Sequence, residues 1–224
     1  MNDLTLIIPA KFESESLPIF LNQIKHFEVK KMVVLDKDDK ETIMSIKNFE
    51  KVDILYQETS GYGSALIEGI KKTKTKYFCI INADGSMNPE DLDKMYKLIF
   101  KNNLDFVFAS RYEKPIGGSD DDDFITTVGN YFFSKIGNIF FSLNISDILF
   151  TYVFGNTQKF NSLNINSNDF TFCVEFPIKA KRNGMRYETI PSYERSRIGG
   201  TKKVSPFLDG WLILIKMVKM FFNK

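Results

Sequence analysis

Residues 77–85 read YFCIINADG, a run of five residues suited to a sheet interior that ends in Asn82, Asp84 and Gly85. A short run of this kind, without alternating polar positions, predicts a strand over 77–81 that is buried on both faces. Asn, Asp and Gly favour turns, since they tolerate unusual backbone angles or bond to their own backbone. The stretch therefore predicts polar side chains directly at the end of a buried strand.

The same pattern recurs on both sides of this stretch. Further strands are predicted over residues 4–8, 32–35, 52–56, 106–109 and 187–190. Helices with apolar residues every three or four positions are predicted over residues 17–27, 40–49, 64–72 and 89–101. Ser14 or Ser16 is expected to cap the first of these helices. Strands that alternate with helices predict an α/β fold with a Rossmann-like, mostly parallel sheet flanked by helices.

Several polar or turn-forming residues fall where predicted strands end, namely Pro9, Asp36, Asn82, Asp84 and Arg111. The carboxyl ends of parallel strands lie at one edge of a sheet, and open α/β sheets bind their ligands there. The sequence therefore predicts a site at this edge.

Composition bounds the class of protein. The chain has 224 residues, 43% of them hydrophobic, enough for a folded core, and no internal boundary divides it, so a single domain over 1–224 is expected. A net charge of +2 offers no basic field for nucleic acid. Two distant cysteines and one histidine provide no structural zinc site. The sequence shows neither a secretory leader nor an apolar run of about 20 residues, so no membrane span is expected.

The second half begins with a polar loop over 113–124 that contains four consecutive aspartates, Asp120–Asp123. We expect a hydrated loop, with a second metal site or acceptor recognition as the alternative. Two amphipathic helices are predicted over 131–143 and 207–222. They are expected either to lie on a bilayer, with Lys216 and Lys219 at anionic headgroups, or to pack together or in a homodimer interface.

Six motifs occur in order along the chain: IIPAKFESESLP, VVLD, GYGSAL, NADGSMNPEDL, ASRY and RIGGTKK. Together they resemble family 2 glycosyltransferases of the GT-A fold, and most closely the branch of dolichol-phosphate (polyprenyl-phosphate) mannose and glucose synthases. The resemblance covers nearly the whole chain. It implies a nucleotide-sugar-binding half over 1–112, an acceptor half over 113–206 and a C-terminal amphipathic helix over 207–224.

The resemblance also implies a donor site. Its expected members are Pro9, Ala10, Glu13, Asp36, Gly61, Gly63, Asn82, Asp84 and Lys202. The family's D-x-D motif is Asn82-Ala83-Asp84 here, so Asp84 would bind Mg²⁺ or Mn²⁺ with Ser86 beside the metal. Asn82 would then bond the ribose or a metal-bound water.

Other matches concern catalysis and the acceptor. Arg197 and Lys203 match two cations that fold over the donor diphosphate, with Lys202 as the alternative to Lys203, and Gly199 and Gly200 permit a mobile loop. Arg111 would face the acceptor phosphate. Asp147 would act as general base for a hydroxyl acceptor, or order the site for a phosphate acceptor, which needs no strong base.

The expected activity is a metal-dependent, inverting transfer of a hexose from a nucleoside diphosphate sugar to a polyprenyl phosphate. A second enzyme hypothesis keeps the fold but transfers to a sugar hydroxyl during polysaccharide or glycan assembly. A hypothesis from another class is a sugar-nucleotide-binding pseudoenzyme, because Asn82 departs from D-x-D. The expected location is cytoplasmic, peripheral on the cytoplasmic face of the membrane.

Overall fold

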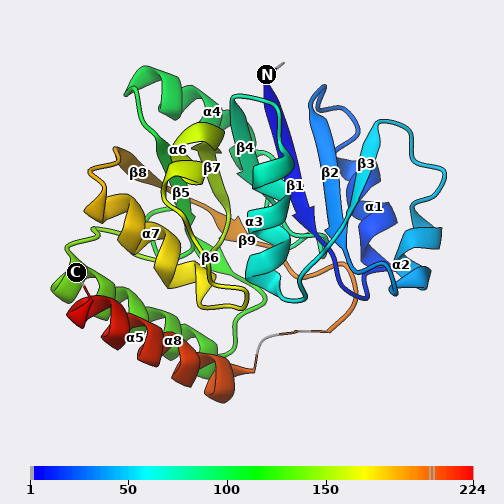
Figure 1. Cartoon of the computed structure of the whole chain (residues 1–224). Helices are drawn as coiled ribbons and strands as arrows, with labels where there is room; N and C mark the ends of the chain where they lie inside the picture. The colour runs from blue at the N-terminus through cyan, green and yellow to red at the C-terminus, as the bar shows by residue number, and fades with distance from the viewer. Residues whose placement is uncertain (1–2, 202, 204, 224) are drawn as a thin grey trace.

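The computed structural model describes residues 3–201, 203 and 205–223 (Figure 1). Its main sheet has the order β3-β2-β1-β4-β7-β5-β8. The strands are β1 (Leu4–Pro9), β2 (Lys30–Leu35), β3 (Val52–Tyr56), β4 (Tyr77–Ile80), β5 (Phe106–Ser110), β7 (Val153–Asn156) and β8 (Tyr187–Pro191). β7 pairs antiparallel with β4 and β5, whereas the other neighbours in this sheet pair parallel. The predicted α/β fold with a mostly parallel sheet is confirmed.

Helices cover both faces of this sheet (Figure 1). One face carries α1 (Ser16–Gln23), α2 (Lys40–Ser45) and α4 (Asp91–Lys101), and the other carries α3 (Tyr62–Lys72), α6 (Thr157–Ser162) and α7 (Phe172–Arg182). The remaining helices, α5 (Phe124–Phe141) and α8 (Pro206–Phe222), pack against each other and against α7. Figure 1 shows them side by side outside the α7 layer.

The strands are apolar on both sides because each side meets a separate core. In β1, Ile7 packs with the α3 and α7 side, while Leu6 and Ile8 pack with the α1 and α4 side. Successive strand residues point to opposite faces, so an unbroken apolar run is what a doubly covered strand requires. This explains why the runs read from the sequence lacked alternation.

Some helix boundaries differ from the predicted ones, among them those of α1 and α5. α1 ends at Gln23 rather than at 27, and its N-cap position is Glu15, which makes no side-chain capping bond. The expected serine cap is therefore wrong: Ser16 is buried and donates its hydroxyl hydrogen bond to Glu13. α5 begins at Phe124 rather than 131, because the Asp123 carboxylate accepts from the Thr126 amide at 2.7 Å.

The polar loop over 113–124 contains a short strand, β6 (Gly118–Ser119), paired parallel with β9 (Tyr193–Glu194). β9 directly precedes the basic segment that contains Arg197. The pairing therefore brings the acidic run of the second half beside the basic segment near the end of the chain.

α5 and α8 run in the same direction, since Gly210 lies near Phe133 and Phe221 packs against Phe140 with ring centroids 5.5 Å apart. Lys216 on α8 points to α7, where its Nζ lies 3.1 Å from Glu175 Oε2, so its expected headgroup contact is wrong. Lys219 is exposed. Among the helices of the described residues, none combines the length and hydropathy needed to cross a membrane.

Candidate active site

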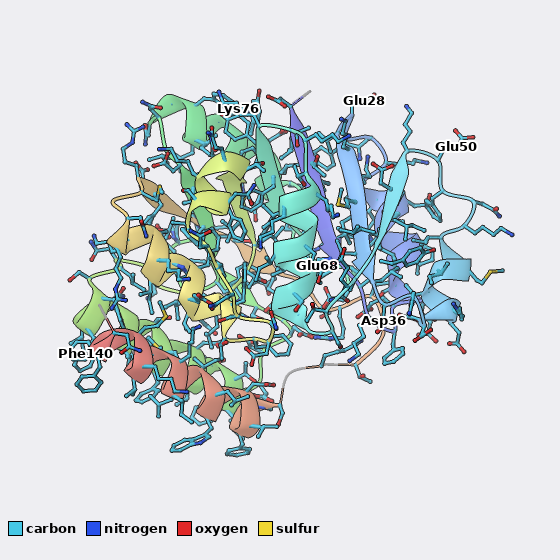
Figure 2. All side chains as sticks on the ribbon, viewed as in Figure 1. Glu28, Asp36, Glu50, Glu68, Lys76 and Phe140 are labelled. Carbon is cyan, nitrogen blue, oxygen red and sulfur yellow. The ribbon has the colours of Figure 1, made fainter. Side chains whose placement is uncertain are left out.

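The strand ends open into a cavity of about 580 Å³. Figure 2 shows Asp36 at this edge of the sheet and Lys76 at the opposite edge. The lining includes most of the predicted site: Pro9, Ala10, Glu13, Asp36, Gly61, Asn82, Asp84, Ser86, Arg111, Arg197 and Lys203. Gly63 and Asp147 are absent from this lining. Lys202 lies outside the described residues.

Asp84 sits in the turn that follows β4. Its Oδ1 accepts from the Ser86 amide at 3.0 Å and from the Ser86 hydroxyl at 2.9 Å. Its Oδ2 lies 3.8 Å from Nη1 of Arg197. One carboxylate oxygen is thus fixed by the turn, while the other faces a cation across the cavity.

The turn and the basic segment are joined through their backbones. The Ile198 amide donates to the Asp84 carbonyl at 2.8 Å, and the Arg195 amide donates to the Ser86 carbonyl at 2.8 Å. Gly85 has φ +74°, and a Cβ there would lie 2.3 Å from Ile198 Cδ1. The backbone angle is what favours glycine at 85, since the Ile198 side chain could shift to admit a Cβ.

Arg197 has a second acidic neighbour. Its Nε and Nη2 donate to the two carboxylate oxygens of Asp121, at 3.1 and 2.7 Å. These hydrogen bonds are the largest cause that raises the pKa of Arg197. The guanidinium therefore presents one edge to Asp121 and its Nη1 towards Asp84.

Lys203 reaches the opposite wall of the cavity. Its Nζ donates to Glu13 Oε1 at 2.8 Å, and Glu13 also accepts from Ser16. Gly200, between the two cations, has φ +75°. Arg197 and Lys203 pair with carboxylates from different segments, Asp121 and Glu13.

Asn82 is held by an aromatic residue that the motifs did not identify as a site member. The Tyr62 hydroxyl donates to Asn82 Oδ1 at 3.1 Å and lies 2.5 Å from Thr151 Oγ1. The Tyr62 ring stacks on Phe170 with centroids 4.9 Å apart. Burial raises the pKa of the Tyr62 hydroxyl, so it remains a neutral donor that orients the amide.

The two glycines of the GYG motif pack closely against protein backbone, not only beside the expected nucleotide site. A Cβ at Gly61 would lie 2.1 Å from the Asn168 carbonyl oxygen, and one at Gly63 would lie 2.1 Å from the Ser167 carbonyl oxygen. Their small size therefore admits the 167–169 backbone against the start of α3. Gly61 also lines the cavity, whereas the tight contact at Gly63 is with protein.

Arg111 is buried, with 6% of its surface exposed. Its Nε and Nη2 donate to Asp147 at 2.7 and 3.0 Å. Its Nη1 donates to Asp122 at 2.9 Å and to Glu194 at 3.0 Å. The phosphate-facing arginine implied by the motifs is thus already surrounded by three carboxylates.

Asp147 and Glu194 differ in their access to the cavity. Asp147 is 1% exposed and also accepts from the Arg111 amide at 3.1 Å, so its geometry is that of a residue that orders Arg111. Glu194 lines the cavity, and burial raises its pKa despite the opposing charge of Arg111. Sequence reasoning missed Glu194, although it stands three residues before Arg197.

The run Asp120–Asp123 is not the expected hydrated loop. Asp120 accepts from the Tyr193 hydroxyl at 2.5 Å, and Asp123 caps α5. Asp121 pairs with Arg197, and Asp122 accepts from Arg111, Tyr112 and Asn130. Asp120, Asp121 and Asp122 thus meet donors from outside the run, whereas Asp123 bonds locally as the N-cap of α5.

Comparisons with known proteins identify the family of the chain. Residues 5–163 match the family described as Glycosyl transferase family 2. An uncharacterized glycosyltransferase of Mycobacterium tuberculosis is 26% identical over 211 residues, covering 94% of each chain. The UDP-N-acetylglucosamine–dolichyl-phosphate N-acetylglucosaminyltransferase of Methanococcus voltae is 23% identical over 252 residues, covering 96% of each.

A solved structure shares the fold. Glucosyl-3-phosphoglycerate synthase from Mycobacterium tuberculosis, in complex with Mn²⁺, UDP-glucose and phosphoglyceric acid, superposes with a TM-score of 0.75 at 10% identity. The match covers 98% of this chain and 80% of that one. The family match extends over more than half of the chain, from β1 to α6. The predicted enzyme class, a hexosyltransferase, is confirmed: the chain belongs to glycosyl transferase family 2.

Proposed function

We propose that this enzyme transfers a hexose, with inversion, from a nucleoside diphosphate sugar to a polyprenyl phosphate, with Mg²⁺ or Mn²⁺. The observation that carries the proposal is one continuous cavity. Asp84, Arg197 and Lys203 lie along it, and apolar side chains of α5 and α8 line it as well. Residues 1–112 would hold the donor, 113–206 the acceptor, and 207–224 an apolar surface beside the acceptor.

The residues at Asp84 fit a divalent cation that arrives with the donor. Asp84 Oδ2 and the Ser86 hydroxyl are hard oxygen ligands, and no group of three or more acidic, histidine or cysteine side chains in the described part of the chain forms a metal site alone. Mg²⁺ commonly binds through one or two carboxylates plus substrate phosphates. When bound, the cation would neutralise the departing diphosphate.

Arg197 and Lys203 would act on the same leaving group. In the described structure their partners are Asp121 and Glu13, at 2.7 and 2.8 Å. Both pairs are partly exposed, so a diphosphate in the cavity would meet the open Nη1 of Arg197 and would compete with Glu13 for Lys203. Positive groups fixed around a leaving group stabilise its developing charge. Lys202, expected to bind the donor and to be the alternative to Lys203, keeps that place in the proposal.

The acceptor end supports a lipid. Ile125 and Phe133 of α5 and Phe207 and Ile213 of α8 line the cavity. The outer surface of the same two helices exposes further large apolar side chains: Val128, Tyr131, Phe132, Ile139, Phe140, Leu208, Trp211, Val218, Phe221 and Phe222. Figure 2 shows Phe140 projecting away from the protein. An isoprenoid chain would leave the cavity along this surface.

The same surface supports a peripheral position on the cytoplasmic face of a membrane. Exposed Lys135 and Lys219 lie on α5 and α8, where anionic headgroups would meet them. The relative from Methanococcus voltae is named for a dolichyl-phosphate acceptor, which agrees with this proposal. A homodimer that covers α5 and α8 is the competing use of the surface.

A specific observation favours a second acceptor class. Around Arg111 the carboxylates of Asp122, Asp147 and Glu194 outnumber the single cation. Such a site suits a neutral sugar hydroxyl, for which Glu194, which lines the cavity, would accept the proton, while Asp147 orders Arg111. A phosphate would be repelled there unless it binds nearer to Arg197 and Lys203.

Parallel assays with two acceptors distinguish the two acceptor classes. The enzyme is incubated with Mn²⁺ and radiolabelled UDP-, GDP- or dTDP-hexose, together with either farnesyl phosphate or farnesol-linked hexose. The proposal expects label on farnesyl phosphate, and anomeric analysis of that product should show inversion. Label on the glycoside alone would identify a hydroxyl acceptor. If neither transfer nor donor hydrolysis occurs with any acceptor, the result would favour a binding protein without catalysis.

A further inference from the structure

The pairing of Asp121 with Arg197 is not used by the proposed reaction. Two carboxylates flank this guanidinium, and they hold it unequally. Asp121 accepts from Nε and Nη2 at 3.1 and 2.7 Å, whereas Asp84 Oδ2 stands 3.8 Å from Nη1. A bidentate pair fixes both the position and the plane of a guanidinium. Asp121 therefore decides how close Arg197 comes to Asp84.

The backbone at 197 cannot move away to compensate. The Ile198 amide bonds to the Asp84 carbonyl and the Arg195 amide bonds to the Ser86 carbonyl, both at 2.8 Å. Arg197 thus stays beside Asp84 whatever its side chain does. A movement of Nη1 by about 1 Å would bring it within hydrogen-bond range of Asp84 Oδ2.

Asp121 itself is held from the opposite side. Its amide donates to the Ser119 hydroxyl at 3.1 Å, and Ser119 belongs to β6, which pairs with β9. Ser119 also donates to Glu194 at 2.6 Å. The backbone of Asp121 is therefore tied to the same short sheet that leads into the basic segment.

We infer that Asp121 is a positioning residue that holds Arg197 off Asp84. With Asp121 in place, Asp84 keeps one oxygen open to a divalent cation, and Nη1 of Arg197 stays open to a diphosphate. Without it, Arg197 closes on Asp84 and neutralises the cation's ligand. The inference rests on the proposed function, because it takes Asp84 as the residue that holds the metal.

Binding of Mn²⁺ in the presence of UDP or GDP, whose diphosphate completes the cation's ligands, tests the inference without any turnover. Free Mn²⁺ is titrated by electron paramagnetic resonance, and Asp84→Asn defines the binding that depends on Asp84. Asp121→Asn should weaken that binding roughly tenfold, equivalent to about 1.4 kcal/mol. Asp120→Asn removes the neighbouring carboxylate, which bonds to Tyr193 instead, and should leave the binding unchanged. Asp121→Glu, which keeps the carboxylate, should restore part of the loss.

A double variant separates positioning from simple charge. In an Arg197→Gln background, Asp121→Asn should have no further effect, because the arginine that it restrains is gone. An equal loss in both backgrounds would overturn the inference and identify a direct electrostatic effect. Unchanged binding in Asp121→Asn would overturn it as well. If the wild-type protein shows no Asp84-dependent Mn²⁺ binding, the metal role in the proposed function fails, and the inference fails with it.

Discussion

Asp84 and Asn82 come from one turn but meet different partners. Ser86 fixes one oxygen of Asp84, and Tyr62 fixes the amide of Asn82. The missing first carboxylate of D-x-D is thus replaced by an oriented amide rather than by a solvated side chain. A single carboxylate then carries the charge that a metal would meet at this turn.

Replacing Asp84 should therefore reduce the transfer rate more than so small a change in the side chain suggests. Asp84→Asn keeps the volume and the bond from Ser86 but removes the charge, and we expect transfer to fall by roughly 10²-fold or more. The effect is measured as the initial rate of transfer with Mn²⁺ and with the donor that the acceptor assays identify. Asp93→Asn, on the exposed side of α4, is the matched control. Transfer within threefold of wild type would contradict the metal role of Asp84.

Gly63 and Gly129 offer a pair of glycines with opposite surroundings. A Cβ at 63 would meet the Ser167 carbonyl at 2.1 Å, whereas a Cβ at 129 meets nothing within 4 Å. Gly63→Ala should lower the free energy of unfolding by about 1–3 kcal/mol, because backbone must move. Gly129→Ala, inside α5, should raise it by about 0.5–1 kcal/mol. Urea unfolding measures both, and equal effects would contradict the packing of 167–169 on α3.

The helices α5 and α8 each have one face in the core and one in solvent. Phe133, Ile213 and Met217 are buried, while Phe140 and Trp211 are 55% and 61% exposed. Periodicity predicts that such helices exist and which face is apolar. Periodicity does not show that the apolar face of each helix is wider than the area that the neighbouring helix buries. The packing of α5 on α8 leaves a large apolar surface open.

Vesicle flotation tests what covers this surface. The double variant Phe140→Ser, Trp211→Ser should reduce binding to vesicles with anionic lipid by roughly tenfold or more, since full burial of each large apolar side chain contributes about 1.5–3 kcal/mol. Met44→Ser, on exposed α2, is the control and should bind like wild type. Wild-type protein that stays dimeric in gel filtration and does not float would contradict membrane docking and favour the homodimer.

Across the whole molecule, buried charges join segments that are distant in sequence. Glu175 of α7, with a side chain 1% exposed, pairs with Lys179 at 2.6 Å and with Lys216 of α8 at 3.1 Å. It also accepts from the Ser167 amide at 2.8 Å. One carboxylate thus ties α8 and the 164–169 loop to α7, and through them to the wall of the cavity.

Lowering the pH should weaken the ion pairs of Glu175 and so lower the stability of the protein. Burial alone would raise the pKa of Glu175, but the bonds from Lys179 and Ser167 and the charge of Lys216 outweigh it, and the pKa lies below its usual 4.5. A carboxyl group whose pKa is lower in the folded protein than in the unfolded chain stabilises the fold at pH values above its unfolded-state pKa. That stability is lost as the pH falls through its folded-state pKa. Wild-type stability should therefore fall below pH 4.5 more steeply than that of Glu175→Gln, which should be less stable at pH 7. Urea unfolding between pH 3 and 7 measures both, and parallel profiles would contradict this account.

The sequence by itself determined six of the seven strands of the main sheet, their order along the chain and the polar residues at their ends. Local rules suffice there, because apolar runs, helical periodicity and turn residues act within a few positions. The sequence also indicated Asp84, Arg197 and Lys203 through motifs whose spacing is local. The insertion of antiparallel β7 between β4 and β5 was outside these rules, since pairing partners are chosen by packing across the sheet.

Only the tertiary structure decided the charge partners. Asp121 meets Arg197 and Asp122 meets Arg111 because β6 pairs with β9, a contact between segments about a third of the chain apart. A run of aspartates has the same local pattern whether it is hydrated or paired, since an ion pair depends on distance in space and not on spacing in sequence. For the same reason Arg111, which by its motif would face a phosphate, lies instead among carboxylates that only the fold brings to it.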